Sequence, residues 1–285
     1  MRRKKKKKGS VKDLSNASPA EVAKAFAGEV RLLTDDVSQD FDGEILPSEL
    51  RSLDTAIGVG GFPKGRVVEI FGPESTGKTA LCLHMIAKTQ KAGSKGGIID
   101  VEHALNLGHA RQLGVDVPSM LFSQPDSGEA AMSLALRLIK SRAVDVLVVD
   151  SVAQLQPLKE QEKGIEGNTM GGQAALMSKS MRFLKKEALN NGVLLMFTNQ
   201  IRYKIGVMYG NPETTPGGQA LRFNADIRIR ISLEGVHKKG GRTIGLDSKL
   251  RIVKNKVGIP FQNARLRLVY GKGWRSLKTK DDDNN

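Results

Sequence analysis

The chain contains 285 residues, 39% of them hydrophobic, and carries a formal net charge of +15. That length suits one substantial α/β core with small appendages. No apolar stretch approaches the ~20 residues of a membrane-spanning helix, and no apolar segment follows the charged N-terminus as in a secretory signal, so we expect a cytoplasmic protein. The single cysteine, Cys82, excludes an internal disulfide and a four-cysteine zinc site, and we expect it to be a buried packing residue.

The positive charge is concentrated in two segments. Residues 2–8 are all Arg or Lys, and residues 236–280 hold thirteen Arg or Lys against one acid, Asp247. Such concentration favours a polyanionic partner, with nucleic acid first. For the first segment, a solvated tail without a specific ligand is an equally good interpretation.

The sequence of the N-terminal part indicates little regular structure. Residues 1–15 read as a disordered basic tail. The segment Ser18-Pro19-Ala20-Glu21 has the pattern of a capping box with proline at the first helical position, and the helix can end at Gly28. A strand-like stretch follows at residues 29–33. Because so short a helix is not stable alone, we expect residues 16–48 to form an oligomerisation segment that packs on something else, such as another subunit.

From residue 49 to residue 275, predicted strands alternate with predicted helices, which favours one α/β core with a mostly parallel sheet flanked by helices. Nearly unbroken apolar runs predict buried strands at 67–71, 98–101, 146–149 and 193–198, with helices between them at 79–91, 127–142 and 173–190. After Ala225, apolar residues alternate with cations. This pattern predicts antiparallel, half-exposed strands, with Ile227, Ile229 and Ile231 on one face and Arg228 and Arg230 on the other. Residues 276–285 remain as a short acidic tail.

A glycine-rich segment follows the first buried strand. It reads Gly72, Pro73, Glu74, Ser75, Thr76, Gly77, Lys78 and Thr79, which fits the phosphate-binding pattern G-x-x-x-x-G-K-T between a strand and a helix. Backbone N–H groups and the helix N-terminus would surround a polyphosphate. Lys78 would reach the β and γ oxygens, and the Thr79 hydroxyl would bind Mg²⁺. We therefore expect the chain to bind a nucleoside triphosphate, ATP, together with Mg²⁺.

Polar residues follow the other predicted buried strands. Glu102 comes after the second, Asp150 ends the third, and Gln200 comes after the fourth. In an open α/β sheet, ligands bind at the carboxyl ends of the strands. We assign Glu102 as the carboxylate that activates water, Asp150 as a metal ligand, and Gln200 as an amide that contacts the γ-phosphate. Each acid taken alone could instead be a helix cap or part of a structural ion pair.

Several segments, in this order, closely resemble the bacterial RecA recombinases. They are residues 72–79, 100–105, 148–151, 199–202, 206–215 and 253–256, and the similarity spans about residues 45–273. The resemblance implies a RecA-like ATPase core and a DNA-dependent ATPase that forms filaments on single-stranded DNA, pairs them with duplex DNA and exchanges strands. It implies that Lys254 and Lys256 enter the neighbouring subunit's site, and that Gln200 couples nucleotide state to DNA binding.

The resemblance also implies two DNA-binding loops, at about 156–172 and 201–218, neither of which reads as regular structure. The residues implied to contact DNA are Met170, Ser178, Arg182, Arg202, Ile205, Gly217 and Gly218. The resemblance implies that Asn106, His109 and Tyr270 lie near the adenine of the nucleotide. Asn106 and His109 replace an acid and a tyrosine of the family pattern. An arginine of that pattern is Ala175 here. The family's further C-terminal domain is also missing from the sequence, which suggests a shortened form.

Two other functions are compatible with the same core. A ring-forming DNA motor or helicase would use a similar ATPase, but such motors usually rely on an arginine across the interface, whereas this chain offers Lys254 and Lys256. A DNA-coating filament protein could use ATP only as an assembly ligand, but such a site has no need of the water-activating Glu102.

Overall fold

The computed structural model describes residues 14, 17–26, 43–163, 171–204, 206, 210 and 212–277. The chain divides into two compact units, residues 1–42 and residues 43–285. In the first unit, α1 (Pro19–Ala25) begins at the predicted capping box, where the Ser18 side chain and the Glu21 backbone amide are 3.4 Å apart and Glu21 accepts from the Ser18 amide at 2.8 Å. The helix ends before Gly28, and the predicted strand at 29–33 lies outside the described residues.

In the second unit, a nine-stranded sheet runs in the order β13-β12-β11-β10-β3-β7-β6-β4-β5. The strands β3, β4, β5, β6, β7 and β10 pair in parallel, whereas β10 to β13 pair antiparallel. Their bounds are β3 Val67–Gly72, β4 Gly96–Asp100, β5 Leu121–Ser123, β6 Val146–Asp150, β7 Leu194–Gln200, β10 Ile227–Lys239, β11 Arg242–Asn255, β12 Asn263–Val269 and β13 Gly273–Ser276. The predicted mixed sheet, parallel first and antiparallel at the end, is confirmed.

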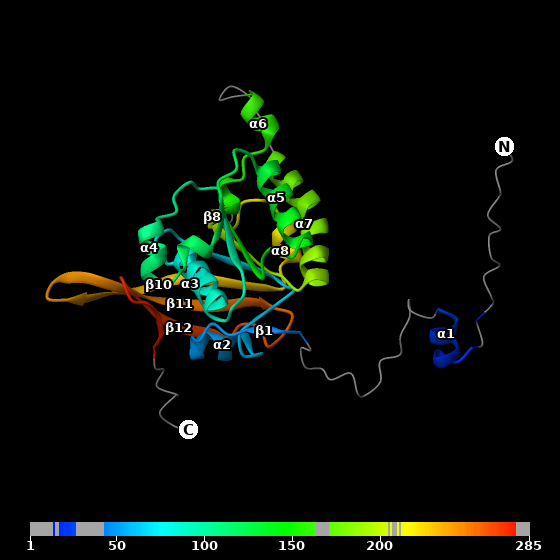
Figure 1. The fold of residues 1–285 in the computed structure, drawn as a ribbon, viewed down its shortest axis with the longest axis horizontal. Coiled ribbons are helices and arrows are strands. Elements are labelled where there is room, and N and C mark those ends of the chain that lie inside the picture. The colour runs from blue at the N-terminus through cyan, green and yellow to red at the C-terminus, as the bar shows by residue number, and fades with distance from the viewer. Residues whose placement is uncertain are drawn as a thin grey trace. The chain divides into compact units, whose positions relative to one another are not determined.

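Helices cover both faces of the parallel strands (Figure 1). They are α2 Arg51–Ile57, α3 Lys78–Lys91, α4 Leu107–Gln112, α5 Gly128–Lys140, α6 Leu158–Lys163, α7 Gly172–Asn191 and α8 Ala220–Asn224, with single turns at Val117–Ser119 and Val152–Gln154. The three long helices, α3, α5 and α7, lie where the sequence predicts them. In the described part of the chain, no helix has both the length and the apolar character needed to span a bilayer.

Two segments predicted as irregular contain regular structure. Within the first, α6 forms at residues 158–163, where Lys, Glu and Gln favour a helix and Glu129 accepts from the Leu158 amide. Within the second, β8 (Arg202–Tyr203) pairs with β9 (Glu213–Thr214). A further short pair joins β1 (Ile45–Leu46) to β2 (Phe62–Pro63), so the second unit includes residues that the sequence groups with the N-terminal segment.

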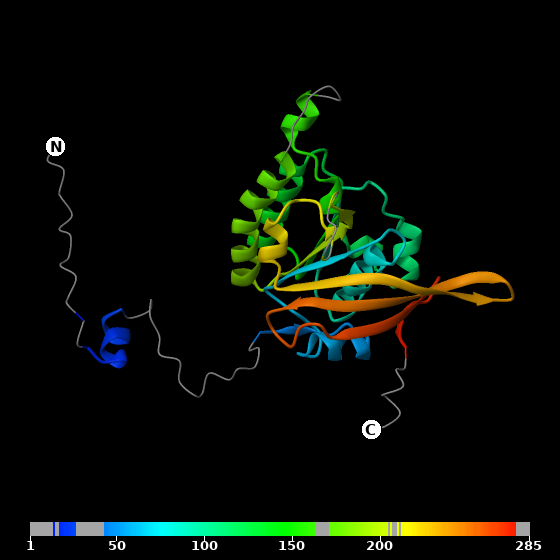
Figure 2. The same cartoon turned by 180° about the vertical axis from the view of Figure 1, so that it is seen from behind.

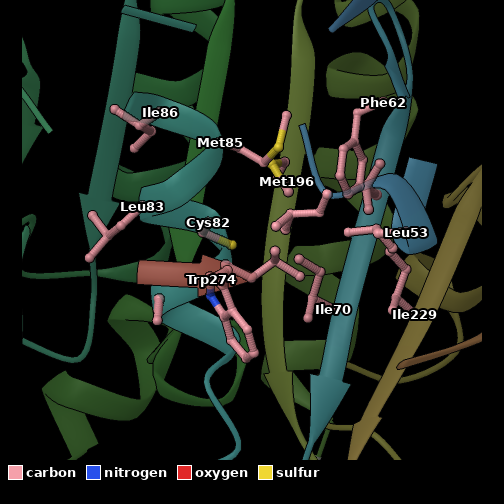
Figure 3. Packing of buried hydrophobic residues seen from close by; sticks show 14 of the residues in the cluster. Leu53, Phe62, Ile70, Cys82, Leu83, Met85, Ile86, Met196, Ile229 and Trp274 are labelled. Carbon is pink, nitrogen blue, oxygen red and sulfur yellow. The ribbon is translucent and has the colours of Figure 1, made fainter. Parts of the chain in front are cut away.

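The core has two halves, one on each face of the sheet. Successive residues of a parallel strand belong to different halves: Val68 and Ile70 pack with α3, whereas Val67 packs with α5 and α7. This arrangement explains why the parallel strands read as continuous apolar runs. Figure 3 shows Cys82 of α3 among the buried residues of the first half, so its prediction as a packing residue is confirmed.

The antiparallel strands follow the predicted alternation with one exception. The apolar residues at 227, 229, 231, 250, 252, 266 and 268 are all buried. Arg228, however, is only 8% exposed, because β10 lies beside β3 in the middle of the sheet and Arg228 pairs with the buried Glu69. The prediction that Arg228 lies on a solvated face is therefore wrong. The distal part of the β10–β11 hairpin extends beyond the sheet (Figure 2).

Candidate active site

The predicted phosphate-binding loop connects β3 to α3, which begins at Lys78. Close packing explains two of its glycines. A Cβ at Gly72 would lie 2.1 Å from the carbonyl oxygen of Ile231, and a Cβ at Gly77 would lie 2.5 Å from the Trp274 ring. Gly77 also has a φ of +95°, in the region that favours glycine. The loop backbone therefore packs directly against β10 and β13.

Lys78 is held inside the loop that precedes it. Its Nζ donates to the carbonyl oxygens of Gly72 at 3.1 Å and Pro73 at 2.7 Å. Burial lowers the pKa of Lys78, and the nearby negative charges of Asp150 and Glu102 oppose that shift. The ammonium group is thus positioned at the centre of the loop, where an anion would meet it.

Thr79 and Asp150 meet, as expected for two groups that share a metal ion. The Thr79 hydroxyl donates to one oxygen of the Asp150 carboxylate at 2.6 Å, and the Thr198 hydroxyl donates to the other at 2.5 Å. Burial raises the pKa of Asp150, whereas the two hydroxyl donors act in the opposite direction. The described residues contain no group of three or more His, Cys, Asp or Glu side chains placed to hold a metal. One hydroxyl and one carboxylate nevertheless suit Mg²⁺, which takes its remaining ligands from water and phosphate.

Glu102 follows β4 and is fixed from β6. The Ser151 hydroxyl donates to its carboxylate at 2.5 Å, and the backbone amides of Val101 and Glu102 both donate to the carbonyl oxygen of Asp150. Two adjacent strand ends are therefore tied together at the point where Glu102 leaves the sheet. A carboxylate in such a position can accept a proton from a water molecule held beside it.

Lys78, Thr79 and Glu102 line one pocket of about 440 Å³ at the carboxyl ends of the parallel strands. Its walls are formed by Glu74, Ser75, Gly77, Lys78, Thr79, Ala80, Glu102, His109, Gln200, Leu246, Leu268 and Tyr270. Of the other predicted loop residues, Thr76 is buried and its hydroxyl donates to the Pro73 carbonyl oxygen. Asn106 lines an adjacent pocket of about 530 Å³ with Thr79 and His109, and its side chain caps α4.

Lys254 and Lys256 do not line this pocket. Lys254 lines another pocket, of about 430 Å³, and its Nζ donates to the carbonyl oxygens of Arg222 and Phe223. Its pKa is lowered to about 8, chiefly by burial and then by the charges of Lys256 and Lys185. Lys256 lies 3.8 Å from the buried carboxylate of Asp226, which Lys185 approaches to 2.8 Å. Action of the two lysines on a neighbouring subunit stays a prediction.

The described residues that are predicted to bind DNA lie on α7, on β8 and in the turn that precedes α8. Ser178 and Arg182 are exposed on α7, as is Ala175, and Arg202 is exposed on β8. Gly217 and Gly218 have φ values of +83° and +71°, and the Gly217 amide donates to the Gln173 side chain. Met170 and Ile205 lie outside the described residues.

Sequence reasoning missed four side chains that hold the site together. Ser151 directly follows Asp150, and Thr198 lies two residues before Gln200. Nothing in the sequence distinguishes these two hydroxyl groups from other residues at the strand ends. Asn199 is fully buried and donates to Glu69, which is also fully buried. A signal for Glu69 did exist, since it is a lone acid inside the apolar strand Val67–Phe71. An acid there needs a buried partner.

The chain is similar to known proteins over most of its length. The model of the RecA N-terminal domain family matches residues 13–275. The chain is 48% identical over 246 residues to Protein RecA 2 of Myxococcus xanthus, which covers 86% of this chain and 69% of that protein. It is 46% identical over 258 residues to Protein RecA of Thioalkalivibrio sulfidiphilus, covering 90% of this chain and 75% of that one.

A solved structure shares the fold at much lower sequence identity. The crystal structure of the RadB recombinase is 18% identical, with a TM-score of 0.61, and the match covers 82% of this chain and 100% of that chain. This likeness supports the fold, while the family model and the bacterial relatives show the family. The chain belongs to the RecA family of recombinases.

Proposed function

We propose that this chain is a DNA-dependent ATPase that forms filaments on single-stranded DNA and catalyses homologous pairing and strand exchange. One observation carries the proposal: Lys78, Thr79, Glu102 and Gln200 line a single pocket, with Asp150 bonded to Thr79. A pocket that only binds a nucleotide needs no carboxylate for water. Glu102, held by Ser151, therefore favours hydrolysis over use of ATP as an assembly ligand alone.

The roles of the residues follow from their chemistry. Lys78 and the loop amides would bind the phosphate oxygens, and Thr79 with Asp150 would hold Mg²⁺, which when bound neutralises charge on the phosphates. Glu102 would orient a water molecule against the γ-phosphate and accept its proton, while Ser151 keeps the carboxylate in place. Gln200 would contact the γ-phosphate from β7. His109 and Tyr270, in the same pocket, would lie near the base, with Asn106 close by.

The neighbouring subunit would complete the site. Lys254 lines a pocket rich in cations, separate from the phosphate-binding loop, so it can serve a triphosphate only across an interface. We propose that Lys254 and Lys256 of one subunit stabilise charge on the γ-phosphate held by the next. Residues 16–48 would help to form that interface, and α1, which has only seven residues, would gain stability from it.

Single-stranded DNA would contact Ser178 and Arg182 on α7, Arg202 on β8, and the backbone amides of Gly217 and Gly218. Met170 and Ile205 are proposed to lie between groups of bases. Contacts to phosphates would make binding independent of sequence and sensitive to salt. Duplex DNA is the second nucleic-acid partner, and the cytoplasmic location expected from the sequence is part of the proposal.

Electron microscopy combined with a strand-exchange assay tests this function. With single-stranded DNA and a slowly hydrolysed ATP analogue, the protein should form helical filaments, and with ATP it should transfer a strand from a homologous duplex. Closed rings under the same conditions would favour a DNA motor instead. Filaments without strand exchange, even at high protein concentration, would reduce the function to DNA coating.

A further inference from the structure

The buried side chain of Asn199 is hydrogen-bonded to the two residues that flank the segment 201–215, Gln200 and Pro216. Asn199 is fully buried on β7, just before Gln200. Its Oδ1 accepts from the Gln200 amide at 3.0 Å, and its Nδ2 donates to the Pro216 carbonyl oxygen at 3.1 Å. Gln200 lines the nucleotide pocket, and Pro216 directly precedes Gly217 and Gly218.

The orientation of Asn199 is fixed from two other strands. Its Nδ2 also donates to Glu69 on β3 at 3.0 Å, so both amide hydrogens have acceptors. Glu69 is fully buried and accepts in turn from the Arg228 guanidinium on β10 at 2.5 Å. The guanidinium carbon of Arg228 lies 4.4 Å from the centroid of the Phe71 ring. A swapped amide would place Oδ1 against a carboxylate, so only one orientation of Asn199 is compatible with these partners.

We propose that Asn199 is a positioning residue that couples nucleotide binding at Gln200 to DNA binding at Gly217 and Gly218. The inference rests on the proposed function, because it concerns the same two ligands. We call the hydrogen-bonded set Glu69, Asn199, Gln200 and Pro216 the clasp.

The coupling follows from the geometry of the clasp. The amide group of Asn199 bonds the Gln200 amide and the Pro216 carbonyl oxygen together, and its bond to the charged Glu69 limits the orientations it can take, since bonds to charged groups are the stronger ones. A change in the backbone at Gln200 is therefore transmitted to Pro216, which shares the same amide group. The adjacent Gly217 amide is bonded to Gln173, whose Nε2 donates to the Val152 carbonyl oxygen two residues after Asp150. One end of the segment is thus bonded to the end of β7, and the other is connected through Gln173 to Val152, just after β6.

The test compares nucleotide-dependent DNA affinity among matched variants. The readout is the ratio of the dissociation constants for a fluorescent single-stranded oligonucleotide without nucleotide and with a slowly hydrolysed ATP analogue. In Asn199→Ala the nucleotide-dependent gain in affinity should fall about 10-fold, measured at an analogue concentration that saturates each protein. Ile139→Val on α5, a conservative substitution in the buried core, serves as the control for loss of stability, and it should leave the ratio unchanged.

A second pair of variants separates the hydrogen bond from the ion pair. Glu69→Gln with Arg228→Met removes both charges but keeps an acceptor for Asn199, whereas Glu69→Leu with Arg228→Met removes the acceptor as well. The first double variant should keep most of the nucleotide-dependent gain in DNA affinity, and the second should lose it. If Asn199→Ala does not fold, this pair still decides the question, because its two members differ only in the acceptor.

The outcomes distinguish the clasp from the function on which it rests. An unchanged ratio in Asn199→Ala, or equal ratios in the two double variants, would overturn the clasp while leaving the proposed function intact. A wild-type protein whose DNA affinity does not respond to the nucleotide would overturn both. Hydrogen exchange gives an independent check, since amides at 217–219 should exchange faster in Asn199→Ala than in Ile139→Val, and equal exchange would count against the clasp.

Discussion

Two pockets of the second unit differ in the charge they carry. The pocket at the phosphate-binding loop contains the acids Glu74 and Glu102 and one cation, Lys78. The pocket around Lys254 contains the cations Lys204, Arg222, Arg228, Arg230 and Lys254, and its one acid, Glu213, is bonded to Arg230 through two hydrogen bonds. The first pocket thus holds one cation and two acids, whereas the second holds five cations and one acid. The contrast supports the proposal that each pocket is half of a site.

The two pockets also differ in how their functional groups are held. In the first, side chains from adjacent strand ends bond to one another, as Thr79 does to Asp150 and Ser151 to Glu102. In the second, Lys254 is bonded to two backbone carbonyl oxygens at the end of α8. The groups of the first pocket are positioned within one chain, whereas in the proposed mechanism Lys254 would exchange its bonds for contacts with a partner.

The largest expected effect is on the first pocket. Glu102→Gln should lower ATP turnover about 10³-fold, because the amide cannot accept a proton from water. Nucleotide affinity should stay unchanged. It can be measured by the fluorescence of Trp274, the single tryptophan, which packs against Gly77 of the loop. Normal turnover would show that the base lies elsewhere.

The corresponding change in the second pocket should act across an interface. Lys254→Ala should lower turnover about 10²-fold by removing a charge that stabilises the γ-phosphate. Mixed with Lys78→Ala subunits, which keep Lys254 but bind nucleotide poorly, it should regain part of the activity at mixed interfaces. No recovery under conditions where the two variants demonstrably co-assemble would argue that Lys254 acts within its own chain.

Loss of the loop lysine should affect binding rather than chemistry. Lys78→Ala should weaken nucleotide affinity by about 10- to 100-fold, the effect expected for a hydrogen bond to a charged group, and should abolish nucleotide-dependent filaments. Titration of Trp274 fluorescence with ATP measures the change. Retained affinity would count against the role given to this loop.

A smaller effect is expected for Ser151, which acts by orienting Glu102. Ser151→Ala should lower turnover about 10-fold, because Glu102 loses the hydroxyl that orients it, while nucleotide affinity stays the same. Ser151→Thr keeps a hydroxyl and should retain more of the activity. If both variants turn over ATP like the wild type, Ser151 has no positioning role.

The smallest effect is a pH dependence in the second pocket. The pKa of Lys254 is lowered from 10.5 to about 8, so its charge is present below that pH and is lost above it. The kcat/KM for ATP, which reports the ionisation of the free protein, should therefore fall as the pH rises through about 8, and Lys254→Arg should flatten that fall, since arginine stays charged. Because an unfolded lysine keeps its ordinary pKa, the free energy of unfolding contributed by this group should rise with pH between the two values. If the wild type and Lys254→Arg show the same fall with rising pH, that fall belongs to another ionisable group.

The two pockets were not equally predictable from the sequence. The phosphate-binding loop is contiguous, and Glu102, Asp150 and Gln200 each follow a readable apolar strand, so topology alone brings them to one edge. The second pocket depends on β10 lying beside β3, a pairing of residues 159 positions apart at Glu69 and Arg228. Alternation of residues predicted a solvated Arg228, because that pattern does not reveal which strand is covered on both faces.

The central claim is that a triphosphate lies between adjoining protomers, bound by Lys78 of one and Lys254 of the next. A cryo-electron microscopy map of the protein on single-stranded DNA with a slowly hydrolysed ATP analogue tests it most directly. The account predicts density for the nucleotide at each subunit boundary, with Lys254 released from the carbonyl oxygens of α8 and directed at the γ-phosphate. Nucleotide density away from every boundary, or Lys254 still bonded to its own α8 in the filament, would contradict it.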